Sequence, residues 1–177
     1  MAKKYVKDYR LTDSVNTRGK LHTECEYIGG YFFFSADAET VRKKTRLLGV
    51  FCAAGWVCWL APLFCNNGAM HIPFISFPYL FAALSLWLMS TAAYTALTAK
   101  EPMKRRQADR LQTWIPGTSL ATAILSGIAM LGIAISLIFE IGSLNSFDWL
   151  FGSCAVLLFT ISVAVFSIRK TFRMEER

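Results

Sequence analysis

The chain has 177 residues, 54% of them hydrophobic, and its 19 Lys and Arg against 12 Asp and Glu give a formal net charge of +7. This length accommodates one domain, and the hydrophobic fraction exceeds the roughly 45–50% of soluble chains. The basic residues flank apolar runs and do not alternate with aromatic residues on one face, so nucleic acid is not an expected partner.

Residues 1–46 are polar and precede the first apolar run, whereas a cleavable signal peptide would place that run first. Alternating side chains and turn residues predict a small cytoplasmic β-hairpin or meander, with short strands at 4–12, 20–28 and 30–34. The Gly29-Gly30 pair is typical of a two-residue hairpin turn, because glycine reaches the positive φ that such turns need.

The aromatic stretch 31–34 is expected to pack at the membrane interface or against a partner. After it, Ser35 or Asp37 is predicted to cap a helix that runs into the first apolar run, because these side chains accept hydrogen bonds from first-turn N–H groups. Pro62 is expected to kink or end that helix.

Four runs are long enough to cross a membrane, because a helix rising 1.5 Å per residue needs about 20 apolar residues for a core of roughly 30 Å. The predicted transmembrane segments are 47–65, 74–98, 118–139 and 147–168. The expected fold is an all-α integral membrane protein, in which two antiparallel helical hairpins form a four-helix bundle. Pro116-Gly117 is expected to open the third segment.

The charge distribution predicts the orientation. All Lys and Arg lie in 3–46, 100–110 and 169–177, whereas the connections 66–72 and 140–146 contain none. Basic residues stay on the cytoplasmic side. We therefore expect a multi-pass protein of the plasma or inner membrane, with the N-terminus, the basic segment 99–116 and the tail 169–177 in the cytoplasm.

Part of this basic side is predicted to contact anionic lipid headgroups, each well-placed residue contributing about 1 kcal/mol. The candidates are Arg42, Lys43, Lys44, Arg46, Lys104, Arg105 and Arg106. The alternative is that these charges only set the topology. The segment from 103 to 115 is either a surface helix or a solvated loop.

Small residues in the third segment predict a helix-packing face, since close backbone approach holds helices together in lipid. The face comprises Ser119, Ala123, Gly127 and Gly132, and it predicts that the third helix is the most buried.

Candidate chemistry is sparse, and no cofactor is expected. His71, Glu140 and Asp148 share the non-basic side and could form a polar or metal-binding cluster. The alternative is ordinary loop polarity with Ser146 capping the fourth helix and Asp148 in its first turn.

The cysteines offer one candidate metal site and one pair that could be considered for a disulfide bridge. His22 and Cys25 could be half of a zinc site, which needs four ligands, so only a homodimer could complete it. A bridge between Cys65 and Cys154 is not expected, because the two lie at different depths by the helix rise.

The apolar segments contain no internal Asp, Glu, Lys, Arg or His, which coupled transporters and pumps keep there. This favours a non-catalytic accessory, assembly or regulatory component, which binds other membrane subunits or itself. One alternative is an oligomeric small transporter or channel subunit for an uncharged or small solute, with a hydroxyl-lined path. Full packing of both Ser126 and Tyr94 would count against it. Another is a membrane enzyme, which requires His71, Glu140 and Asp148 to converge.

Overall fold

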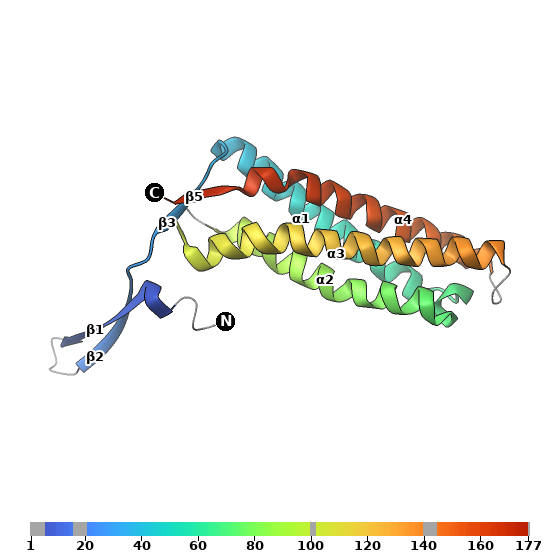
Figure 1. The fold of residues 1–177 in the computed structure, drawn as a ribbon, viewed down its shortest axis with the longest axis horizontal. Helices are drawn as coiled ribbons and strands as arrows, with labels where there is room; N and C mark the ends of the chain where they lie inside the picture. Colours follow the sequence, from blue (N-terminus) through green and yellow to red (C-terminus); the bar gives the residue numbers. More distant parts are fainter. Residues whose placement is uncertain (1–5, 16–20, 100–101, 140–144, 177) are drawn as a thin grey trace.

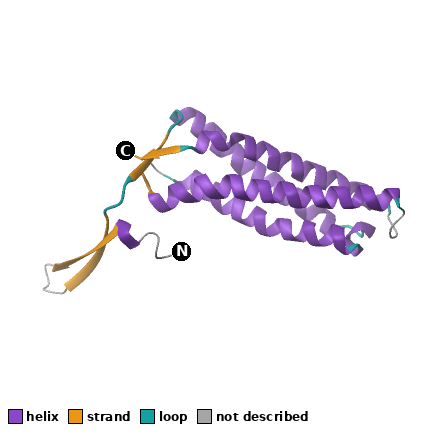
Figure 2. Ribbon diagram, viewed as in Figure 1, coloured by secondary structure: helices purple, strands orange, loops and turns teal. Residues whose placement is uncertain are grey.

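The computed structural model describes residues 6–15, 21–99, 102–139 and 145–176. It contains four helices that are long and apolar enough to cross a membrane. They are α1 (Ala38–Leu60), α2 (Pro73–Thr98), α3 (Arg105–Ile138) and α4 (Ser146–Ser167), and they lie side by side in one bundle (Figures 1 and 2). The predicted all-α four-helix bundle is confirmed at this level.

Short 3₁₀ turns extend the bundle at its ends. Ala61–Phe64 continues α1, Gly68–His71 precedes α2, and Ile168–Phe172 continues α4. Asp37 is the N-cap of α1, as predicted, and its carboxylate accepts a hydrogen bond from Thr40 N at 2.8 Å. Pro62 lies just beyond the end of α1, where it cannot disturb an α-helical hydrogen bond.

The helices pack in a ring in which each helix contacts two neighbours: α1 lies against α2 and α4, and α3 lies against the same two helices. The main buried positions in each helix are separated by steps of three or four residues. On α2 they include Ile75, Tyr79, Ala82, Leu86, Met89, Ala93 and Ala96, and on α4 Asp148, Phe151, Ala155, Leu158, Ser162 and Val165. An average step of 3.5 residues is the pattern of left-handed helical bundles.

The bundle encloses hydroxyl-bearing residues together with large apolar ones such as Leu86 and Phe151, and it exposes large apolar residues on its outside as well. Its buried polar residues include Ser85, Ser119, Thr122, Ser126 and Ser162. Large exposed side chains occur on every helix, among them Val57, Phe81, Trp87, Leu131 and Trp149. A soluble bundle would bury the large apolar side chains and expose the polar ones. Exposed apolar surface of this extent is typical of contact with lipid or with another protein.

Two small sheets lie at one end of the bundle. Strands β1 (Tyr9–Val15) and β2 (Leu21–Tyr27) pair antiparallel, with Tyr9 opposite Tyr27. Strand β3 (Tyr31–Phe34) lies between β4 (Met103–Lys104) and β5 (Met174–Glu176) in a second sheet. The second sheet therefore joins the N-terminal segment, the segment before α3 and the C-terminal tail at the same end of the molecule (Figure 1).

The predicted Gly29-Gly30 hairpin turn is wrong, because β3 pairs with β4 and β5 instead of folding back on β2. The aromatic stretch has an intramolecular partner. Phe34 lies edge-on to Phe172 with ring centroids 6.3 Å apart, and both Phe32 and Phe34 pack on the core. Burial of these rings against the tail outweighs the local turn preference of two glycines.

The third helix starts earlier than predicted, at Arg105 instead of Thr118, and it passes through Pro116 without ending. The segment 105–115 is therefore neither a loop nor a separate surface helix. Leu111 and Ile115 are fully buried, so packing continues up to the proline. Beyond it, Thr118 Oγ1 donates to Trp114 O and Ser119 Oγ to Pro116 O, and such hydroxyl bonds help a proline to persist in a membrane-type helix.

Candidate functional site

The non-basic end of the bundle is closed by a clasp centred on Asp148. Asp148 is only 4% exposed, and its Oδ1 accepts a hydrogen bond from Ala69 N at 2.7 Å. Its Oδ2 accepts a hydrogen bond from Asn145 N, and Asn145 Oδ1 accepts one from Phe147 N. The carboxylate therefore ties the start of α4 to the 3₁₀ turn before α2.

This clasp revises the predicted cap. The N-cap of α4 is Asn145 and not Ser146, with Asp148 three residues later in a capping box. An Asn followed by an acid at this spacing is the signal that could have identified the cap from the sequence. Asn145 Nδ2 also donates to Asn66 O at 2.8 Å, which adds a second link between the two connections at this end.

The cluster of His71, Glu140 and Asp148 receives no support as a reactive or metal-binding centre. His71 is exposed, whereas Asp148 is buried and both its oxygens accept backbone hydrogen bonds. Glu140 lies outside the described residues. Among the described residues, no group of three His, Cys, Asp or Glu side chains could hold a metal ion.

The cysteines do not add a site. Cys65 and Cys154 are free thiols, as are Cys52 and Cys58 in α1, and Cys25 is an exposed free thiol. The side chain of His22 lies outside the described part of the chain.

An aromatic cluster lies next to the clasp and was not predicted. Tyr79 is fully buried, with its ring 4.6 Å from Phe151 and 6.5 Å from Trp59. Its hydroxyl donates to Cys58 O at 2.8 Å, and Trp59 Nε1 donates to Tyr79 O at 2.8 Å. The hydrogen bonds join α1 to α2, and the ring contact with Phe151 joins α2 to α4. The cluster therefore stabilises helix packing and is not an open binding site.

The predicted small-residue face is placed partly inside the bundle. Ser119, Ala123 and Gly132 are buried, while Gly127 is half-buried and faces the Phe159 ring. Steps of four residues advance 40° around a helix, so such a face drifts out of the core. The main buried stripe of α3 follows steps of three or four residues and includes Ala108, Leu111, Ile115, Ser119, Thr122, Ser126, Ala129, Ile133 and Ser136.

The expectation that α3 is the most buried helix is wrong. In the most apolar 18-residue stretch of each helix, 44% of the residues of α2 are buried, against 39% for α3. The interface between α2 and α3 is the most extensive in the bundle, so the two helices bury each other.

Hydroxyl groups run through the interface between α2 and α3. Ser85 Oγ and Thr122 Oγ1 lie 2.8 Å apart, and Ser126 Oγ donates to Thr122 O at 2.7 Å. Ser126 is fully buried, whereas Tyr94 is 68% exposed on the outside of α2. The hydroxyls of Ser85, Thr122 and Ser126 are engaged in hydrogen bonds across or along helices, which is the usual role of Ser and Thr in helix packing. Tyr94 is not packed, so the full packing of both residues that would count against a transporter is not observed.

The predicted lipid-contact residues gather at the opposite, basic end. Arg42, Lys43 and Arg46 are exposed on α1 and Lys44 is half-buried, while Lys104, Arg105 and Arg106 are exposed at the start of α3. Lys43 makes an ion pair with Glu39 at 2.7 Å. The two groups share one end because β3, which leads into α1, pairs with β4, which leads into α3.

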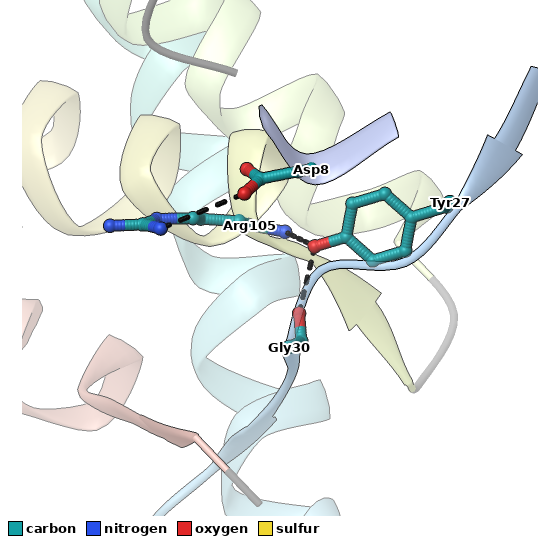
Figure 3. A network of polar contacts seen from close by, with 4 residues as sticks. All are labelled: Asp8, Tyr27, Gly30 and Arg105. Carbon is teal, nitrogen blue, oxygen red and sulfur yellow. Dashed lines mark hydrogen bonds and ion pairs between the residues drawn. The ribbon is translucent and has the colours of Figure 1, made fainter. Parts of the chain in front are cut away.

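A polar network anchors β1 and β2 to this end, as Figure 3 shows. Arg105 N donates to the Tyr27 hydroxyl at 3.0 Å, and that hydroxyl donates to Gly30 O at 2.8 Å. The Arg105 guanidinium lies 3.8 Å from Asp8 Oδ1. Lys104 Nζ lies 5.4 Å from the centroid of the Tyr27 ring. The first turn of α3 is therefore the anchor of the N-terminal strands.

Comparison with protein families, curated proteins and solved structures gives no match to this chain.

Proposed function

We propose that this chain is a multi-pass protein of the plasma or inner membrane that acts as a non-catalytic accessory, assembly or regulatory component of a membrane complex. In this proposal both termini and the basic segment before α3 lie in the cytoplasm. Its partners are the bilayer, through anionic headgroups at the basic end, and other membrane subunits or further copies of itself.

The observation that carries the proposal is the apolar outer surface of the bundle, combined with the hydroxyl groups that it encloses. Large apolar side chains such as Phe81, Trp87 and Leu131 are exposed around the helices, while Ser119, Thr122 and Ser126 are enclosed. In water this arrangement would leave the hydrophobic surface uncovered, whereas in lipid it costs little, because packing of small residues and hydroxyl bonds hold the helices together.

The charge pattern supports the accessory role over a coupled transporter. No Asp, Glu, Lys, Arg or His occurs within 47–64, 73–98, 111–138 or 149–167. Ion- and proton-coupled transport depends on such groups within the membrane. The buried hydroxyls of Ser85, Thr122 and Ser126 bond to one another or to helix carbonyls, which supports a packing role for them.

The arm formed by β1 and β2 supports a cytoplasmic partner. It extends away from the bundle (Figure 1) and consists of two strands. An isolated pair of strands is only marginally stable in water. Leu11 on this arm is 71% exposed. A partner that covers the arm would bury this apolar surface and supply the stability that two strands lack.

Topology and co-purification together test the proposal. Reporter tags at the two ends should both be cytoplasmic, and a tag inserted at residue 66, at the other end of the bundle, should be accessible from outside. After mild detergent extraction, a stable companion protein is expected. A homo-oligomer without a companion would favour the transporter or channel alternative, and tags on opposite sides of the membrane would contradict the proposal.

A further inference from the structure

A cavity of about 370 Å³ opens at the basic end, between the last turns of α2 and the first turns of α3. Cationic side chains and hydroxyl-bearing side chains share its lining. The cations are Lys104, Arg106 and Arg110, and the hydroxyls belong to Tyr94, Thr95 and Thr98. Among the described residues no carboxylate lines the cavity, so the charge of this described lining is positive.

Two of these cations are oriented by aromatic rings, and none of the three forms an ion pair with a described residue. Lys104 Nζ lies over the rings of Tyr9 and Tyr27, and the Arg110 guanidinium lies 4.7 Å from the centroid of the Trp114 ring. Arg106 makes no ion pair with a described residue. Aromatic faces orient a cation and leave its N–H groups available to an anion.

The position of these charges conflicts with helix stability. Lys104 is the N-cap of α3, Arg105 and Arg106 follow in the first turn, and that turn contains no acid. The N-terminal end of a helix is the positive end of its dipole, so cations are disfavoured there and anions are favoured. The same end of a helix is where phosphate groups bind in many proteins. A bound phosphate would offset both the dipole and the mutual repulsion of the cations.

The cavity also lies at the depth where headgroups are found, if the helices cross a membrane. Tyr94 and Leu97 in the last turns of α2 are exposed. Tyr94 lines the same cavity as the basic residues at the start of α3. Tyr and Trp at such a boundary are typical of the membrane interface. Arg106 and Arg110 are four residues apart and therefore lie on one face of α3.

We propose that this cavity binds the phosphate group of an anionic phospholipid from the cytoplasmic leaflet, with Arg106 and Arg110 as its principal ligands. Arginine pairs with phosphate oxygens through two N–H groups at once. The Lys104 ammonium adds a third cation to the lining. The inference rests on the proposed membrane placement, and it adds one defined lipid site to the diffuse attraction of a basic surface.

The test uses the full-length protein in lipid nanodiscs of phosphatidylcholine, with or without phosphatidylglycerol. Native mass spectrometry should detect retained phosphatidylglycerol on the wild type. In the double variant Arg106→Gln/Arg110→Gln the retention should fall about tenfold or more, as the loss of two cation–phosphate contacts implies. The matched control Arg42→Gln/Arg46→Gln removes the same two charges at the same spacing from α1. Because it removes only diffuse attraction to headgroups, it should lower retention at least about threefold less than the cavity variant does. Equal losses in the two double variants would overturn the inference in favour of diffuse surface attraction.

Thermal unfolding provides a second readout that does not depend on detection of the lipid. Phosphatidylglycerol should raise the midpoint of the wild type, because a ligand of the folded state stabilises it. In the cavity variant this increase should disappear, while the midpoint in phosphatidylcholine alone should stay equal or rise, since repulsion in the first turn of α3 is relieved. A cavity variant whose unfolding midpoint in phosphatidylcholine alone falls below that of the wild type would contradict the inference.

Two further outcomes distinguish a lipid phosphate from a soluble phosphate, and the lipid site from the proposed membrane placement. Inorganic phosphate added to the detergent-solubilised protein should not reproduce the increase in midpoint; if it does, the ligand is a soluble phosphate and the lipid assignment is wrong. Failure of the wild type to enter nanodiscs would contradict the proposed function itself. Insertion without any effect of phosphatidylglycerol would contradict only the lipid site.

Discussion

Gly132 offers the sharpest test of helix packing, because a methyl group there has no room. A Cβ at this position would lie 2.8 Å from Ile75 Cγ1 and 3.3 Å from Phe74 Cδ2, on the first turn of α2. Ile75 is fully buried, so its inner methylene cannot swing into solvent. Gly117 on the same helix is the matched control, since a Cβ there meets nothing within 4 Å.

The two Gly→Ala substitutions share the same gain and differ only in their surroundings. Alanine favours a helix over glycine by about 1 kcal/mol. At Gly132 the extra methyl overpacks the contact with α2, which costs about 1–3 kcal/mol. We therefore expect Gly117→Ala to raise the free energy of unfolding by up to about 1 kcal/mol. Gly132→Ala should lie below Gly117→Ala by about 1–3 kcal/mol.

Unfolding of the full chain in mixed micelles, followed by circular dichroism, measures both variants. A double-mutant cycle with Ile75→Ala identifies the contact. Because Ile75→Ala removes the clashing atom, the penalty of Gly132→Ala should largely vanish in that background, giving a coupling of about 1–2 kcal/mol. Equal stability of Gly132→Ala and Gly117→Ala, or additive effects in the cycle, would refute close approach of α2 and α3 at this position.

Three further predictions follow from other contacts. Asp148→Ala should lower the free energy of unfolding by about 1–3 kcal/mol, because buried N–H groups lose their acceptor, while the exposed His71→Ala should change it by less than about 0.5 kcal/mol; equal effects in micelle unfolding would contradict the clasp. Tyr27→Phe removes the hydroxyl that links β2 to the start of α3, so limited proteolysis should release the β1–β2 arm faster while the bundle resists; unchanged release would show that this bond does not anchor the arm. A hydrogen bond from the Thr40 backbone N–H lowers the pKa of Asp37 below its ordinary 3.8, so its capping contribution should be complete above pH 3.8 and lost as the pH falls through the lowered pKa; an NMR titration of the Thr40 amide with a midpoint at or above 3.8 would contradict it.

Local features of the chain were sufficient to predict the four helices that could cross a membrane. Each depends on the length of an apolar run, and length multiplied by the helix rise needs no knowledge of neighbours. The Asp37 cap is equally local, because its carboxylate bonds an N–H three residues away. The capping box formed by Asn145 and Asp148 is equally local, although Ser146 is the N-cap predicted from the sequence.

The outcome of competition between distant segments could not be predicted in this way. Gly29 and Gly30 favour a hairpin locally, but β3 finds more buried surface with β4 and β5. Pro116 favours a helix start locally, but Leu111 and Ile115 pack against the bundle and keep α3 continuous back to Arg105. In both cases tertiary burial outweighs a local preference of a few kcal/mol at most.

The inner face of each helix was also decided only by the tertiary structure. Uniformly apolar runs show no polar side that would mark the face turned outward, so a stripe such as that through Thr122, Ser126 and Ala129 becomes evident only when α2 lies against it. The same holds for the basic cavity, whose lining comes from the end of α2 and the start of α3. Amino-acid composition alone predicts which segments avoid water, but the contacts among them depend on shape complementarity between surfaces far apart in the chain.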